Sequence, residues 1–418
     1  MLRTFWLNLH RYSGLGMAVF LVIVGLTGSV LAYHDVLDEW LNPDRDLVET
    51  KSLPLLDALT LRDRALALAP GMLANNFDLQ VQPNKAYSIQ LTPPGEPVIA
   101  NGMPVGYVAL KLDPYTGQEI SRSDAILGMR AQKFWPLDRE NVLDFLHMLH
   151  VQLVLGQTGD LILGIVALVW VIDCFVAAYL TFPVSRSHSR RSDDKPLRRR
   201  WLARWWNPAW LVKRKTSNFR LNFDLHRAGG LWTWPALLMF AWTSGTFNLH
   251  SVFHPLNDLF FGKQPQFQSA HQAKAQWEPP LEMRSALAVG RRLMAEQARL
   301  HDFQVLDEYS FSYNPQTHYY FLAVNGDPLF GGQDGTFIRF DAVNAKVLEL
   351  HMPSGLDSAV TAREWMSGLH TAAIWGWPYR AFVCVMGLVI TLLSVTGVYI
   401  WWKKRKARNA RFAPADVA

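Results

Sequence analysis

The stretch Leu9–Ala32, LHRYSGLGMAVFLVIVGLTGSVLA, joins a short basic segment with one histidine to an apolar run that begins at Leu15. A helix of about 20 apolar residues crosses a hydrocarbon core of about 30 Å. Comparable runs occur at Leu15–Ala32, Leu161–Phe182, Leu231–Leu249 and Ala381–Trp402. The sequence therefore predicts a mainly α membrane protein with four transmembrane helices. Because the first run is long for a signal peptide and its pattern recurs later, we expect it to remain as an uncleaved anchor.

The composition excludes a disordered or coiled-coil chain, since 50% of the 418 residues are hydrophobic and 18% are charged. The two cysteines, Cys174 and Cys384, both fall inside apolar runs. We therefore expect packed thiols at these positions, without a disulfide scaffold or a redox role.

Basic residues are concentrated beside the predicted spans. Val184–Arg220 contains twelve Lys and Arg against two acids, and the segment from Lys403 onward contains six against one. By the positive-inside rule these segments and the N-terminus lie in the cytoplasm, which places residues 35–146 and 251–369 outside. The two outer connections are acidic, with 16 acids against 10 bases and 13 against 9. The net charge of +6 therefore indicates contact with lipid headgroups and not with nucleic acid.

The two halves of the chain repeat the same signals. Leu9-His10-Arg11 recurs as Leu225-His226-Arg227, at an offset of 216 that also carries His34 onto His250. Leu149-His150 recurs as Leu369-His370 at an offset of 220. We expect a unit of helix, external α+β module and helix that is used twice. Both copies start in the cytoplasm, so the repeats should be parallel and related by a pseudo-two-fold axis along the membrane normal.

Each outer connection has the pattern of a small α+β module. In the first, a helix over Thr60–Ala69 precedes strands at Phe77–Val81 and Ala86–Leu91 around a turn at residues 84–85, and Val108–Asp113 is the last strand. The second connection has the same order of helix and strands. Its elements are a helix at Leu281–Leu300, strands at Phe303–Tyr313 and Tyr319–Val324, a glycine-rich loop at 331–335 and a last strand at Phe337–Asp341. Neither module contains a phosphate loop or a paired-carboxylate motif, so we expect a binding or covering role.

The segment after the last predicted strand differs between the modules. The first reads Asp113-Pro114-Tyr115-Thr116-Gly117, and the second reads Asp341-Ala342-Val343-Asn344-Ala345. We expect the second module to have a different turn and a different partner. The predicted boundaries are transmembrane segments at 1–34, 147–183, 226–250 and 370–402, outer modules at 35–146 and 251–369, a basic loop at 184–225 and a tail at 403–418.

Six histidines lie at ends of predicted spans in three repeat-related pairs: His10 with His226, His34 with His250, and His150 with His370. Ionisable side chains at a membrane boundary are costly and mark functional sites. Neutral imidazoles on facing helices suit haem iron, which takes axial ligands on both faces of the macrocycle, whereas zinc sites usually add Cys or carboxylates at short spacing. The sequence therefore predicts haem, held non-covalently because no CxxCH motif is present. Arg11 and Arg227 directly follow two of the histidines and are candidate partners of haem propionates.

The repeated LHR…G…H span, the LH…G motif ahead of the partner span and the strand LDPYTGQEI at Leu112–Ile120 resemble those of the PepSY-associated transmembrane proteins. The resemblance extends over nearly the whole chain. Within that family the chain is most similar to iron-regulated reductases of the bacterial inner membrane, which release iron from ferric siderophores with two b-type haems. The resemblance implies two periplasmic PepSY-like modules, an oxidoreductase activity toward a ferric siderophore, and haem ligands among the six histidines.

The histidine positions allow more than one haem arrangement. Helical rise separates His10 from His34 by about 36 Å, so two haems stacked across the membrane would form an electron path. We expect one haem between His10 and His226 and the other on a pair among His34, His150, His250 and His370. An alternative places both haems on the external side, with His34 paired to His370 and His150 to His250.

The electron donor should be another molecule, because the basic loop contains no dinucleotide-binding fingerprint. A membrane quinol and a cytoplasmic flavoprotein both fit this requirement. The competing hypothesis is a non-redox, membrane-anchored module that binds a peptide, a chelate or a partner protein in the periplasm. A transporter is less favoured because the predicted spans contain few charges. Asp173 is the clear exception, and we interpret it as a hydrogen-bonded residue packed inside the bundle.

Overall fold

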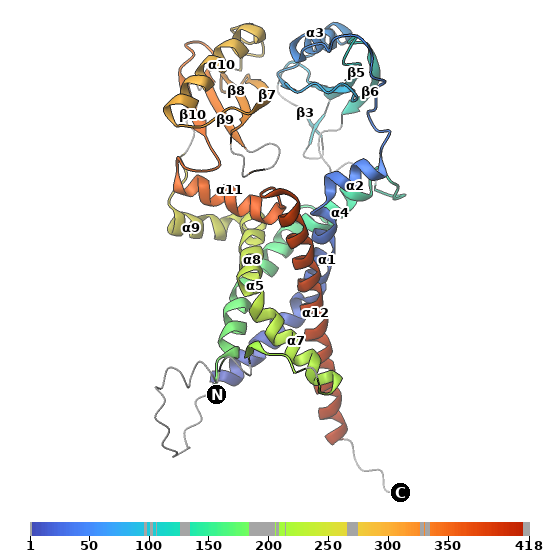
Figure 1. Cartoon of the computed structure of the whole chain (residues 1–418), viewed down its shortest axis with the longest axis vertical. Helices are drawn as coiled ribbons and strands as arrows, with labels where there is room; N and C mark the ends of the chain where they lie inside the picture. Colours follow the sequence, from blue (N-terminus) through green and yellow to red (C-terminus); the bar gives the residue numbers. More distant parts are fainter. Residues whose placement is uncertain are drawn as a thin grey trace.

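The computed structural model describes residues 2–95, 98–100, 103–105, 107–125, 134–183, 205, 209–213, 215–265, 275–326, 330 and 335–412. A bundle of long helices carries an α+β region at one end, and the start of α1 and the end of α12 lie together at the other (Figure 1). We call the α+β region, residues 47–125 and 275–351, the head, and the opposite end of the bundle the terminal end. Most of the predicted basic loop 184–225, the glycines at 331 and 332 and residues 413–418 of the tail lie outside the described residues.

Three helices among the described residues are long and apolar enough to cross a membrane. They are α1 (Leu2–Leu31), α5 (Gln157–Thr181) and α12 (Gly376–Phe412). The third predicted span instead falls on two shorter helices, α7 (Asn218–Trp232) and α8 (Trp234–Asn248). Pro235 lies in the first turn of α8, and because proline has no N–H to donate, the helix is interrupted at Thr233. The count of four continuous spans is therefore not confirmed.

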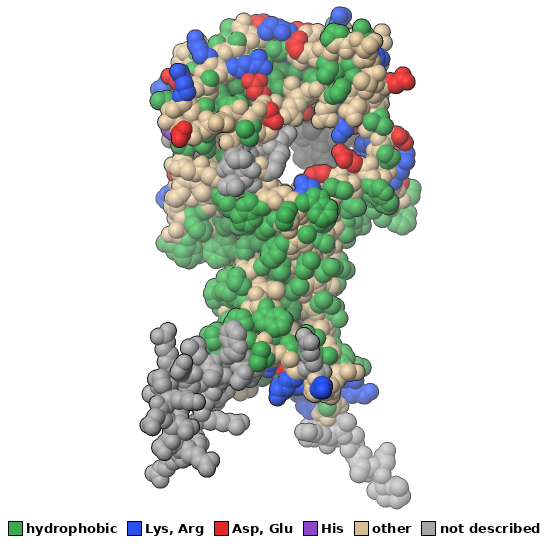
Figure 2. Space-filling model, viewed as in Figure 1, with side chains coloured by type: hydrophobic (Ala, Val, Ile, Leu, Met, Phe, Trp, Pro, Cys, Tyr) green, Lys and Arg blue, Asp and Glu red, His purple; other side chains and the backbone are tan. Residues whose placement is uncertain are grey.

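The bundle is held together by close helix crossings. The most extensive contacts join α1 to α12 and α5 to α8. A Cβ built on Gly25 of α1 would lie 2.7 Å from the carbonyl oxygen of Gly387 on α12. Near this crossing the hydroxyl of Ser29 donates to the carbonyl of Cys384, at 2.9 Å. Small residues let membrane helices approach in this way, and hydrophobic side chains cover the visible outer surface of the bundle (Figure 2).

The crossing at Gly25 predicts a stability effect. Gly25→Ala should lower the free energy of unfolding by about 1–3 kcal/mol, because the added methyl group collides with backbone that neither helix can easily move. Gly16→Ala on the same helix is the matched control, since a Cβ there meets nothing within 4 Å. Thermal unfolding of the two variants in detergent measures the difference. Equal midpoints would show that the crossing is not tightly packed.

Four short helices lie between the bundle and the head (Figure 1). They are α2 (His34–Leu41), α4 (Val142–Gln152), α9 (His250–Phe261) and α11 (Ser358–Thr371). Helices α4 and α11 end alike, each at a C-cap residue in the left-handed conformation, Leu153 with φ 54° and Ala372 with φ 59°. Each of these two helices carries a predicted site histidine, His150 or His370, in its last turn.

The head contains two helices, α3 (Ala58–Leu68) and α10 (Met283–Leu300), and three antiparallel sheets. One sheet has the order β2-β5-β6, from Tyr87–Leu91, Tyr107–Leu112 and Glu119–Ala125. A second has the order β1-β7-β8-β9-β10, from Asn76–Asp78, Asp307–Asn314, Tyr319–Asn325, Thr336–Asp341 and Val347–His351. A two-stranded ribbon joins β3 (Val98–Ala100) to β4 (Met103–Val105).

The two predicted outer modules are joined into one body. Strand β1 from the first half pairs with β7 from the second, with Phe77 opposite Phe311, and does not form a hairpin with β2. The buried core of the head is also continuous, because Leu61 and Ile89 belong to the same cluster as Phe311. The expectation that β1 pairs with β2 around the turn at residues 84–85 was therefore wrong, whereas each half supplies a helix and a sheet as expected. Burying Phe77 against Phe311 favours this exchange over a local hairpin.

Two further expectations for the head were wrong. Strands β5 and β9 are not last in their halves, since β6 and β10 follow them. The turns after β5 and β9 are also alike. In each, an aspartate Oδ1, on Asp113 or Asp341, accepts hydrogen bonds from the backbone N–H groups two and three residues later. Ala345 adopts φ 57° where the first turn has Gly117 at φ 70°, so the side-chain hydrogen bonds form the same turn without glycine.

Candidate functional site

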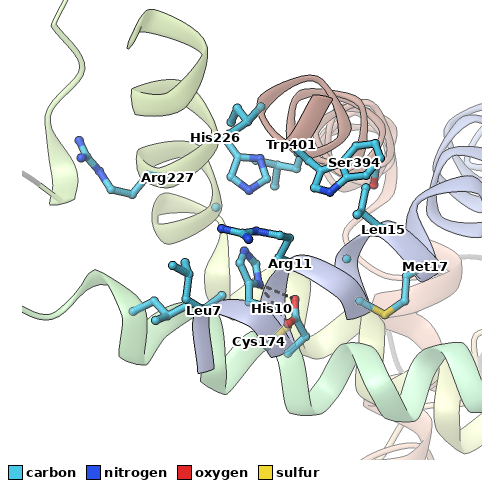
Figure 3. Close-up of a pocket in the computed structure, with 18 of the residues that line it drawn as sticks. Leu7, His10, Arg11, Leu15, Met17, Cys174, His226, Arg227, Ser394 and Trp401 are labelled. Atoms are coloured by element: carbon cyan, nitrogen blue, oxygen red, sulfur yellow. Dashed lines mark hydrogen bonds and ion pairs between the residues drawn. The ribbon is translucent and has the colours of Figure 1, made fainter. Parts of the chain in front are cut away.

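Two pairs of histidines face each other in the bundle. His10 on α1 and His226 on α7 form the terminal-side pair, with ring centroids 6.3 Å apart. Figure 3 shows these two imidazoles directed toward one another. His150 on α4 and His370 on α11 form the head-side pair, also with ring centroids 6.3 Å apart. In both pairs the two members are the residues that the sequence repeat relates.

The spacing within each pair has a chemical meaning. Two imidazoles bound to opposite sides of one metal centre, each with a metal–nitrogen bond of about 2.0 Å, have ring centroids about 6 Å apart. The observed 6.3 Å agrees with this arrangement in both pairs. Among the described residues, no group of three or more His, Cys, Asp or Glu is arranged to hold a metal ion. The spacing of each pair is thus that of two imidazoles that share one metal centre.

Hydrogen bonds at Nδ1 fix the orientation of three of these rings. The Nδ1 atoms of His150, His226 and His370 lie 2.9, 3.1 and 2.6 Å from the hydroxyl oxygens of Thr27, Thr396 and Thr243. Each hydroxyl also donates its hydrogen to the carbonyl of the residue four positions earlier in its own helix. A hydroxyl has one hydrogen, so it accepts a hydrogen bond from the imidazole. Nδ1 is therefore protonated, and the Nε2 lone pair is free for a ligand bond.

The fourth ring has a different partner. Nδ1 of His10 lies 3.0 and 2.9 Å from the two carboxylate oxygens of Asp173 on α5. Ser13, one turn beyond His10, donates its hydroxyl to Oδ1 of Asp173 at 2.9 Å. The carboxylate is buried, with Asp173 8% exposed. The His10 ring is therefore held in the same tautomer as the other three, but by an anion and not by a hydroxyl.

Two glycines leave room for the rings. A Cβ built on Gly28 would lie 2.9 Å from Cε1 of His150, and one on Gly397 would lie 3.2 Å from Cε1 of His226. A larger residue at either position would displace the imidazole from its place in the pair.

A cavity of about 610 Å³ surrounds the terminal-side pair. Its lining is mostly apolar and includes both imidazoles and Asp173, with basic side chains from Arg3, Arg11, Arg227 and Lys404. In Figure 3 the guanidinium of Arg11 lies close to the two imidazoles, whereas that of Arg227 is turned away from them. Arg227 is instead bound to the buried carboxylate of Asp224, at 3.0 Å. The size and lining are those of a small-molecule or cofactor site with a few polar groups.

The structure does not bring His34 and His250 into either pair. His34 begins α2, has a side chain that is 41% exposed and lies 3.6 Å from Asp35. His250 begins α9, and its ring lies beside that of His254, with centroids 4.8 Å apart. Because His370 faces His150, the structure also differs from the alternative that pairs His34 with His370 and His150 with His250.

The two pairs lie at different depths of the bundle. His10 and Thr27, the partner of His150, both lie on the continuous helix α1. Thr27 lies 17 positions after His10, which corresponds to a rise of about 25 Å along the helix axis. The pairs are therefore stacked through the bundle.

Sequence reasoning missed the partners of the imidazoles. Thr27 and Thr243 are separated by 216 residues, the same offset that relates the histidines, so the repeat contained a usable signal for them. Thr396 has no such signal, because the residue 220 positions earlier is Val176. Asp173 was noticed as a charge in a span, but its contact with His10, 163 residues away, depends on how α1 and α5 pack.

Loss of one of these hydroxyls should destabilise the protein. Thr243→Val keeps the side-chain shape but leaves the buried Nδ1–H of His370 without its acceptor, which costs about 1–3 kcal/mol. Thr243→Ser, which retains the hydroxyl, should recover most of the loss. Thr371→Val is the matched control, because that exposed hydroxyl donates to the Ser367 carbonyl of its own helix. Chemical unfolding in detergent compares the three, and equal stability of Thr243→Val and wild type would contradict the assigned hydrogen bond.

No curated protein is significantly similar to this chain in sequence. The family model for the PepSY-associated TM region matches residues 7–404, a range that contains both histidine pairs and their hydrogen-bond partners. The chain therefore belongs to the PepSY-associated transmembrane family.

Proposed function

We propose that the protein is an oxidoreductase of the bacterial inner membrane that holds two haem b groups and passes electrons across the membrane to a periplasmic ferric siderophore. The observation that carries this proposal is the pair of facing imidazoles at each of two depths, with Nδ1 bonded and Nε2 available. Haem iron commonly takes histidine ligands in addition to its macrocycle. His10 with His226 and His150 with His370, each pair with ring centroids 6.3 Å apart, would hold one haem each.

The residues around the two histidine pairs have different roles in the proposed function. The four histidines would hold the iron atoms, and Thr27, Thr243, Thr396 and Asp173 keep the imidazoles in the ligating tautomer. Arg11, Arg3 and Lys404, beside the terminal-side cavity, carry the charges that suit haem carboxylates. The mostly apolar lining suits the apolar macrocycle of a haem. Bound haem supplies one-electron transfer, since its iron exists as Fe(III) and Fe(II).

The direction of transfer follows from the charge distribution. Lys and Arg side chains gather at the terminal end of the bundle, including Lys403, Lys404, Arg405 and Lys406 of α12 (Figure 2). By the positive-inside rule this end is cytoplasmic and the head is periplasmic. The head lies beyond the head-side pair, where a chelate would receive electrons (Figure 1).

The overall reaction balances with a two-electron donor. One quinol gives two electrons and two protons and becomes a quinone, and two ferric chelates each take one electron and become ferrous. A reduced flavin on a cytoplasmic protein would supply the same two electrons. Oxygen-rich chelators hold Fe(II) more weakly than Fe(III), so reduction releases the metal. The chain needs no acid, base or nucleophile for this reaction.

The decisive experiment is the absorption spectrum of protein purified in detergent from haem-sufficient cells. We expect a Soret band and a reduced α-band of six-coordinate haem b, a pyridine haemochrome value near two haems per chain, and full extraction by acid acetone. Addition of a quinol and a ferric hydroxamate should yield ferrous iron, measured with a ferrous-specific dye. A colourless protein would overturn the proposal and leave the non-redox binding module.

A further inference from the structure

The two histidine pairs are not electronically equivalent. Three of the four imidazoles donate Nδ1–H to a neutral threonine hydroxyl, whereas His10 donates to the carboxylate of Asp173. The carboxylate contacts Nδ1 through both oxygens, at 3.0 and 2.9 Å, and is 8% exposed. Burial matters here because solvent and salt screen a buried charge far less than an exposed one.

We propose that Asp173 is a positioning residue that lowers the midpoint potential of the terminal-side haem relative to that of the head-side haem. This inference rests on the proposed function. A carboxylate that accepts Nδ1–H raises the electron density of the imidazole and makes it a more basic ligand. A more basic ligand and a nearby negative charge both favour Fe(III) over Fe(II). The potential of the terminal-side centre is therefore lower than it would be if threonine hydroxyls were the partners of both of its imidazoles.

The positive charges near the terminal-side pair act in the opposite direction to Asp173. Arg3, Arg11, Arg227 and Lys404 line the same cavity, and positive charge raises a midpoint potential. Arg227 is paired with Asp224, which also binds Arg220, and the guanidinium of Arg3 donates to the carbonyls of Leu180 and Phe182 at the bundle edge. Among the charged residues that the structure describes, Asp173 is the one that hydrogen-bonds a ring of these pairs, at Nδ1 of His10.

The consequence is a direction for electron flow. Haems held by His10 with His226 and by His150 with His370 would supply transfer of one electron from the terminal side to the head side. This step is downhill when the terminal-side centre has the lower potential. Asp173 thus favours transfer toward the head and the ferric substrate.

Redox titration followed by optical spectroscopy at fixed pH tests the inference. Asp173→Asn keeps the shape and the hydrogen-bond acceptor but removes the charge. We expect the oxidised-to-reduced ratio of the terminal-side haem to change at least tenfold at a given potential, an upward shift of about 59 mV for a one-electron couple. The head-side haem, whose ligands bond Thr27 and Thr243, should not shift.

Ser13→Ala provides a second variant with the opposite sign. Removing the Ser13 hydroxyl takes one hydrogen bond from Oδ1 of Asp173, so the carboxylate is a stronger acceptor for His10 and the terminal-side potential should fall. Thr396→Val, on the partner ring, is the control for loss of a neutral hydrogen bond. If the Asp173→Asn variant retains two haems with unchanged potentials, the inference is overturned while the proposed function stands. If the wild-type protein contains no haem, the proposed function itself fails.

Discussion

His370→Ala should reduce the haem content from two per chain to one and abolish reduction of an external ferric chelate. The imidazole of His370 faces that of His150, with ring centroids 6.3 Å apart, and is held by Thr243. Without it, the head-side pair has one imidazole left to bind the iron. We expect turnover to fall by more than about 100-fold, because residues one shell beyond the ligands already change metal affinity about 10- to 100-fold. His150→Ala should behave alike. Pyridine haemochrome values and ferrous-iron release measure both effects.

The terminal-side pair should give a different phenotype. His10→Ala or His226→Ala should also leave one haem, but dithionite should still reduce the remaining head-side haem while a quinol no longer does. His34→Ala and His250→Ala are the matched controls, since both histidines lie at helix starts outside the two pairs, and they should retain two haems. Two six-coordinate haems in the His370→Ala variant, or loss of haem in the His34→Ala variant, would contradict the assignment of the pairs.

Phe77→Ala should destabilise the whole head and not the first half alone. Phe77 is 3% exposed and packs edge-to-face on Phe311 across the β1–β7 pairing, with ring centroids 6.1 Å apart. Truncation of a buried phenylalanine costs about 3–5 kcal/mol. Because one buried cluster contains side chains from both halves, hydrogen exchange should become faster in β2 and β5 and also in β8 and β9.

A variant at an exposed position tests whether the loss of stability comes from the burial of Phe77 and not from the loss of any apolar side chain. Ile120 on β6 is 51% exposed, so Ile120→Ala should change stability by about 0.5 kcal/mol or less. Hydrogen exchange by mass spectrometry on the full-length protein in detergent resolves the two halves. Faster exchange confined to β2, β5 and β6 would show that the two halves unfold independently. That result would contradict a core shared by both halves.

Much of the architecture was predictable because its signals are local. The apolar runs are long enough to identify α1, α5 and α12, and helix and strand patterns identify α3, α10, β2 and β8 within a few residues. Local patterns fail where pairing is chosen by distant surfaces. The alternation of residues 77–81 indicates a strand, but its pairing with β7 depends on Phe311, more than 230 residues away. The interrupted helix at Thr233 has a local signal in Pro235, whereas the length of the apolar run predicts one continuous helix.

The site divides in the same way. The sequence by itself determined that His10, His226, His150 and His370 are candidate site residues, because a histidine repeated at matching ends of apolar runs can be recognised without a structure. It predicted that His10 and His226 share one site, but it did not determine which of the other four histidines face one another, and it gave His34 and His250 equal weight. Only the tertiary structure decided that His150 faces His370, since an inter-ring distance depends on how separate helices pack. The same packing places the Asp173 carboxylate against one ring of the four, and this contact between α1 and α5 makes the two pairs different.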